Sequence, residues 1–175
     1  MKTHIIYIVA LLFVFTSCEK EAMDPEVMNA QFQMEADGQK AHLKKVQSFK
    51  AHLSGEQEVP AVETNATGQA MFRLSKDGTS LSYKLIVANI ENVFAAHIHI
   101  APAGTNGGVA VTLYTGQVDG RSNGVLAEGV ITEDDVSGYS LAELLNIMVA
   151  DGAYVNVHTT QKPGGEIRGQ ISANN

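Results

Sequence analysis

From residue 48 onward, the chain consists of short segments in which hydrophobic and polar residues alternate. In one of them Leu81, Leu85 and Val87 share a parity, so they would lie on one face of a β-strand. Glycine, asparagine and aspartate separate the segments, and the Asp77-Gly78 pair between two of them is typical of a hairpin turn. The alternation predicts strands over residues 49–53, 68–74, 81–88, 93–100, 109–114, 125–131, 154–158 and 166–171.

One segment near the C-terminal end has helical spacing instead. Leucine or methionine occupies positions 141, 144, 145 and 148, which fall on one face of a helix. Ser140 immediately precedes this run, and Glu143 lies three residues after Ser140. This spacing is the arrangement of a capping box. About eight short strands and one short helix predict an all-β fold, either a Greek-key sandwich or a Greek-key barrel.

The N-terminal segment has another pattern. An unbroken apolar run extends from Ile5 to Phe15 and follows the basic residue Lys2. The run is too short to cross a bilayer, which requires about 20 apolar residues. Its length suits the hydrophobic region of a secretory signal. We therefore expect residues 1–17 to be a signal peptide.

Cys18 is the only cysteine of the chain, so it cannot form an internal disulfide. The segment from Phe15 to Cys18 resembles the lipobox of bacterial lipoproteins, in which the cysteine receives a diacylglycerol and becomes the first residue. This resemblance predicts an exported lipoprotein, anchored in the cell envelope through Cys18 and facing either the periplasm or the surface. Two alternatives remain: an ordinary signal peptide followed by a free cysteine, and an uncleaved anchor.

Composition divides the remainder into two parts. Residues 18–47 mix acidic, basic and amide side chains without a lasting period, which predicts a tether. Residues 48–175 carry the strand pattern and form the predicted domain.

The chain has 12 basic and 19 acidic residues, for a formal net charge of -7. It contains no basic run, so we expect no nucleic-acid partner.

Three motifs of the predicted domain resemble those of the CHRD (chordin-type) family. They are residues 51–60 (AHLSGEQEVP), 96–104 (AHIHIAPAG) and 155–170 (VNVHTTQKPGGEIRGQ). The His-x-His pair and the later Val-His are also similar to the layout of Cu/Zn superoxide dismutase, a Greek-key barrel. The resemblance therefore implies an immunoglobulin-like or a superoxide dismutase-like arrangement of strands.

Three of the six histidines are candidate metal ligands. His97 and His99 are two residues apart on a predicted strand, so both side chains point to one face. His158 lies on the non-apolar face of a later strand. If these strands are close, three neutral nitrogens converge and suit Zn or Cu with one open position. The alternative is a structural cluster in which the histidines pair with a carboxylate or a backbone carbonyl.

Acidic residues near the histidines invite two interpretations. Glu166 alternates with Arg168, which predicts either an exposed ion pair or a carboxylate that orients His158. Glu56 and Glu58 end the first strand, and we expect them to be solvated loop charges or partners of the histidines.

The sequence favours a non-enzymatic protein, because we find no recognisable arrangement of a nucleophile with a histidine and an acid. The first hypothesis is a lipid-anchored envelope or surface protein whose CHRD-like domain binds an extracellular or periplasmic ligand. The resemblance to chordin, which binds extracellular ligands, supports this view by analogy. The second hypothesis is a metal protein that uses His97, His99 and His158 to hold Zn or Cu, with redox activity if the metal is copper.

Overall fold

The computed structural model describes residues 46–174. The predicted signal peptide, Cys18 and nearly all of the predicted tether lie outside these residues. The elements are β1 (Ser48–Ser54), η1 (Gly55–Gln57), β2 (Thr67–Leu74), β3 (Leu81–Ile100), β4 (Gly108–Ile131), η2 (Glu133–Asp135), α2 (Leu141–Val149), β5 (Ala153–Thr159), β6 (Lys162–Gln170) and β7 (Ser172–Ala173). Within this part of the chain, no helix is both long enough and apolar enough to span a membrane.

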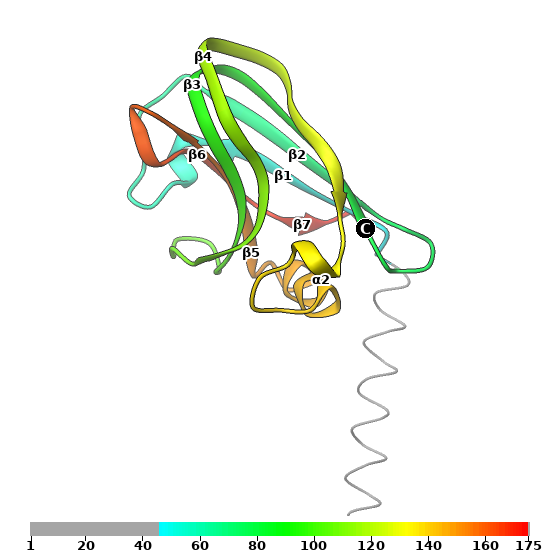
Figure 1. Ribbon diagram of the computed structural model, residues 1–175. Helices are drawn as coiled ribbons and strands as arrows, with labels where there is room; N and C mark the ends of the chain where they lie inside the picture. Colours follow the sequence, from blue (N-terminus) through cyan, green and yellow to red (C-terminus); the bar gives the residue numbers. More distant parts are fainter. Residues whose placement is uncertain (1–45, 175) are drawn as a thin grey trace, which may run out of the picture. The chain divides into compact units, whose positions relative to one another are not determined.

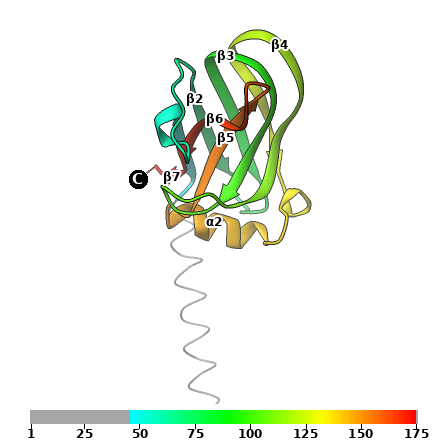
Figure 2. The same ribbon diagram turned by 90° about the vertical axis from the view of Figure 1, so that its left-hand side faces the viewer.

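Five strands close into a barrel (Figures 1 and 2). The order around it is β2, β1, β6, β5 and β3, and β3 pairs with β2 to complete the circle. Each of these pairings is antiparallel. The strand β4 pairs with β3 outside the closed circle, and the short β7 pairs with β1. The all-β fold is thus confirmed, and the architecture is a barrel and not a sandwich.

The core follows the predicted alternation. On β3 the side chains of Leu81, Leu85 and Val87 are buried in the hydrophobic core, as their shared parity predicts. The alternating residues of β1 and β2 contribute Phe49 and Phe72 to the same core. Burial of such side chains is the main stabilising contribution to the barrel.

The predicted helix is confirmed as α2, which lies at one end of the barrel (Figures 1 and 2). The hydroxyl of its N-cap Ser140 accepts a hydrogen bond from the Glu143 backbone N–H, and the Glu143 carboxylate accepts one from the Ser140 N–H at 2.7 Å. The capping box is therefore formed in both directions. The leucine and methionine face of the helix is buried against the barrel.

Two pairs of predicted strands are continuous in the structure. The segments 81–88 and 93–100 form the single strand β3, although Asn89 and Asn92 between them have a left-handed backbone with φ 55° each. Bulges absorb these residues while pairing with β4 continues on both sides. The segments 109–114 and 125–131 likewise join in β4. The sequence pattern predicts a turn at each interruption. It cannot show that a partner strand, distant in sequence, pairs with the residues on both sides and keeps the strand continuous.

The outer face of β3, β5 and β6 is polar but covered. His97 of β3 is paired with Asn156 of β5, which in turn is paired with Arg168 of β6. Every residue of β5 is buried, including those that point away from the core. The face that the alternation predicts to be polar is therefore enclosed, and it forms the floor of the candidate site.

Candidate metal centre

The three candidate histidines lie together, because the two strands that carry them are paired. His97 and His99 project from one face of β3, and β5 pairs with β3 so that His158 lies opposite Ala95. One possible ligand atom from each imidazole falls within 4.8 Å of the others. His99 and His158 are each 8% exposed, whereas His97 is half-buried. The pairing of β3 with β5 thus creates a three-histidine cluster.

Backbone carbonyls orient two of the three imidazoles. The Nδ1 of His99 lies 2.9 Å from the Gly107 carbonyl oxygen, and the Nδ1 of His158 lies 2.9 Å from the Pro163 carbonyl oxygen. A carbonyl oxygen can only accept, so each Nδ1 carries the hydrogen and each Nε2 presents a lone pair. The Nε2 of His99 has no hydrogen-bond partner within the described part of the chain.

The third imidazole faces one of these lone pairs. The Nδ1 of His97 lies 3.1 Å from the Nε2 of His158. Without an ion, His97 Nδ1–H donates to His158 Nε2. Two nitrogens bound to one tetrahedral ion lie about 3.3 Å apart, given metal–nitrogen distances of about 2.0–2.1 Å. An ion could therefore take the place of the hydrogen between His97 Nδ1 and His158 Nε2 with little movement of the two rings. His97 would then carry its hydrogen on Nε2 and bind the ion through Nδ1. The donor set fits Zn or copper.

Burial keeps the histidines neutral. Together with repulsion from His158 and His99, it lowers the pKa of His97 to about 4. Burial is also the largest cause that lowers the pKa values of His99 and His158. At pH 7 all three imidazoles are thus neutral, and each has one ring nitrogen without a hydrogen. This is the protonation state that a cation requires of its ligands.

An aromatic and cationic stack supports His99 from the side. The imidazole of His99 stacks on the ring of Tyr154, with centroids 4.9 Å apart and an interplanar angle of 6°. The guanidinium carbon of Arg168 lies 3.4 Å from the centroid of the same tyrosine ring. Arg168 is only 1% exposed, and it donates hydrogen bonds to the Pro102 carbonyl and the Asn106 side chain. This packing restricts the rotation of His99.

Glu58 is buried beside this stack, which corrects the expectation that it is a solvated loop charge. Its side chain is 6% exposed, and its Oε1 has no hydrogen-bond partner in the described residues. A Cβ on Gly165 would overlap Glu58 Oε1 and crowd Asn156 Nδ2, so this position requires glycine. Burial raises the pKa of Glu58 to about 7, although the positive charge of Arg168 acts to lower it. Glu56, in contrast, is exposed.

The raised pKa of Glu58 predicts a specific pH dependence of stability. The carboxyl of the unfolded chain ionises near pH 4.5, whereas that of the folded protein ionises near 7. The folded state therefore loses stability as pH rises through this window, by about 3 kcal/mol. Glu58→Gln should remove this loss. The measurement is urea unfolding of both proteins at pH values from 4.5 to 8 in the presence of a chelator.

The comparison with Glu58→Gln isolates the carboxyl from the histidines. Their pKa values are lowered, so their contribution is lost in the opposite direction, as pH falls below about 6.5. That contribution is common to both proteins and cancels in the difference. A wild-type minus variant difference that stays constant with pH would contradict the assignment.

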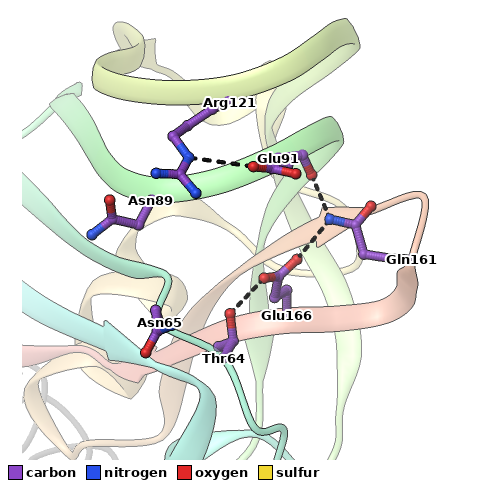
Figure 3. Close-up of a pocket in the computed structure, with 7 residues that line it drawn as sticks. All are labelled: Thr64, Asn65, Asn89, Glu91, Arg121, Gln161 and Glu166. Carbon is purple, nitrogen blue, oxygen red and sulfur yellow. Dashed lines mark hydrogen bonds and ion pairs between the residues drawn. The ribbon is translucent and has the colours of Figure 1, made fainter.

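Glu166 neither forms an exposed ion pair with Arg168 nor orients His158, the two roles that the sequence predicted for it. Its carboxylate accepts hydrogen bonds from the hydroxyls of Thr64 and Thr159, at 2.7 and 2.6 Å (Figure 3 shows the first). The nitrogens of His158 bond instead to Pro163 and His97, so Glu166 is not the group that orients His158. The predicted exposed pair with Arg168 is wrong, because both side chains are buried.

The model of one protein family matches most of the described chain. It is that of the CHRD domain, and the match covers residues 49–171. The chain belongs to the CHRD domain family. No curated protein and no solved structure gives a significant match to it.

The three motifs of this CHRD domain meet at the histidine cluster. The first, residues 51–60, supplies Glu58, and the second, residues 96–104, supplies His97 and His99. The third, residues 155–170, supplies His158 together with Asn156 and Arg168. Sequence reasoning singled out the histidines. It missed Tyr154 and Arg168 as supporting residues, because their burial depends on the segments that cover β5 and β6.

Proposed function

We propose that this CHRD domain is a non-enzymatic binding module whose three-histidine cluster binds one Zn²⁺ or copper ion. The observation that carries the proposal is the orientation of the imidazoles. Two Nε2 lone pairs are directed by backbone carbonyls, and one of them, on buried His99, has no partner in the described residues. Carbonyls that hold the Nδ1 hydrogens of metal-binding histidines in this way are common next to metal ions.

A three-histidine site leaves one coordination position for another ligand. That position supports a binding function, because a side chain of an extracellular or periplasmic partner could occupy it. If the ion is copper, nitrogen ligation also permits one-electron redox chemistry. The alternative is the structural cluster, in which the hydrogen bond between His97 and His158 is itself the purpose of the arrangement.

Metal analysis of the purified protein tests the proposal. Elemental analysis should find one Zn or Cu per chain, and calorimetric titration of the chelator-treated protein should show one site. The absence of both bound metal and binding heat at micromolar protein would favour the structural cluster. Redox cycling of a copper-loaded sample would separate the redox alternative from simple binding.

We also propose that a lipid on Cys18 anchors the domain in the cell envelope, on either its periplasmic or its surface side. The support is the short apolar run before this residue and the lipobox-like segment that ends at it. The anchor would place the domain at a membrane without a spanning helix.

Cys18→Ala should abolish lipid attachment, because the thiol is the group that is acylated. Metabolic labelling with a radioactive fatty acid, followed by fractionation of the cells, measures both the lipid and the membrane association. Label that persists in the variant would contradict the anchor. Ser17→Ala, which keeps a small residue before the cysteine, is the matched control and should retain the label.

A further inference from the structure

A second polar recess, separate from the histidine cluster, lies where β3 changes partners. The strand β3 pairs with β2 up to Ala88 and with β5 from Val93 onward, so residues 89–92 face a gap between the two. We call this recess the notch. It has a volume of about 630 Å³ and is lined by Thr64, Asn65, Asn89, Glu91, Arg121, Gln161 and Glu166 (Figure 3).

One wall of the notch is organised by hydrogen bonds within the protein. Thr64 donates to Glu166 at 2.7 Å, and Gln161 donates to the Glu91 carbonyl at 2.8 Å (Figure 3). Arg121 Nε lies 3.3 Å from the Glu91 carboxylate. These bonds hold the side chains of four chain segments in one arrangement. The wall is therefore largely preformed, as is usual in small-molecule sites.

Other groups of the notch are available for a ligand. The side-chain amides of Asn65 and Asn89 make no hydrogen bond to another residue in the range 46–174, and Figure 3 shows Asn89 beside Arg121 and Asn65 next to Thr64. Asn89 is held with φ 55°, and its N–H bonds to Asn123 Oδ1 at 2.9 Å. A left-handed asparagine maintained by such a bond is the kind of backbone strain that concentrates at functional sites.

The chemistry of the lining excludes three ligand classes. No hydrophobic side chain lines the notch, which argues against apolar ligands. Both oxygens of Glu166 already accept hydrogen bonds and Glu91 is paired with Arg121, so no free carboxylate pair remains for a cation. Arg121 is the only base of the lining and faces two acids, which disfavours an anion.

We propose that the notch binds a neutral, hydroxyl-rich ligand, namely a saccharide unit of a glycan. Each sugar hydroxyl both donates and accepts, and each asparagine amide offers one acceptor and two donor hydrogens. The free nitrogens of Arg121 add further donors. The volume lies within the range of about 300–1,000 Å³ found for small-molecule sites. This inference does not depend on the histidine cluster or on the lipid anchor.

Saturation-transfer NMR on the purified full chain, kept in a detergent without sugar head groups, tests the proposal. The probes are maltotriose, cellotriose and chitotriose. At least one should bind, and the double variant Asn65→Ala/Asn89→Gly should raise its Kd about tenfold, the effect of losing two hydrogen bonds. Asn146→Ala, an amide deletion on α2, is the matched control and should bind like the wild type.

Asn65 and Asn89 are exposed, and glycine tolerates the left-handed backbone at position 89, so the double variant should keep the thermal midpoint of the wild type. The proposal is overturned if none of the three oligosaccharides binds. It is also overturned if the double variant binds as tightly as the wild type. Binding restricted to glucuronate or to Ca²⁺, tested in parallel, would assign the notch to an anion or a cation instead.

Discussion

The variant with His97, His99 and His158 all changed to glutamine is expected to bind no Zn²⁺ or Cu²⁺ in a calorimetric titration. Glutamine retains polarity and similar length but offers no imidazole nitrogen. In the wild type, an ion at 100 times its Kd should stabilise the fold by about 2.7 kcal/mol, because it binds only the folded state. The triple variant should show no such stabilisation in thermal unfolding with and without metal.

His52→Gln is the matched control for this experiment. His52 is exposed on β1 and does not belong to the three-histidine cluster, so the variant should bind metal like the wild type. Single variants extend the test, since loss of His99 removes the one Nε2 without a partner. Undiminished binding in the triple variant would show that the ion lies elsewhere in the chain, and the proposed site would be wrong.

Arg168→Met is expected to destabilise the domain by about 3 kcal/mol. Methionine fills part of the volume of the arginine stem but provides no hydrogen-bond donors. It would leave the Pro102 carbonyl without its 3.1 Å bond and remove the guanidinium from the Tyr154 ring. Bonds from a charged donor contribute about 1.5–3 kcal/mol each. Urea unfolding at pH 7 measures the change in the free energy of unfolding.

Arg73→Met provides the comparison for this substitution. Arg73 is exposed on β2, and replacement of such surface residues usually changes stability by less than about 0.5 kcal/mol. The Arg168 variant should also show a further rise in the pKa of Glu58, because the arginine charge lowers it in the wild type. A loss no greater than that of Arg73→Met would mean that the stack contributes little.

The histidine cluster and the notch share strands of the barrel. The histidine cluster lies on the outer face of β3 and β5, and the notch lies where β3 passes from β2 to β5. Glu166 lines the notch and accepts a hydrogen bond from Thr159, the residue that follows His158.

The sequence by itself determined the local features of this protein. Period-two alternation identified the core faces of the strands, since successive side chains point to opposite sides of a strand. Helical spacing and the pair Ser140 and Glu143 identified α2 and its cap, because both depend on residues within one turn. The same alternation placed His97 and His99 on one face of a strand and His158 on the non-apolar face of another, whereas their approach depended on which strands pair.

Only the tertiary structure decided the features that depend on distant segments. It closed the barrel, joined residues 81–100 into one strand and buried Glu58 and Arg168 under covering loops. It also provided the carbonyls of Gly107 and Pro163 that orient the imidazoles. The physical reason is that periodicity reports which face a side chain occupies, whereas burial and hydrogen-bond partners depend on what packs against that face.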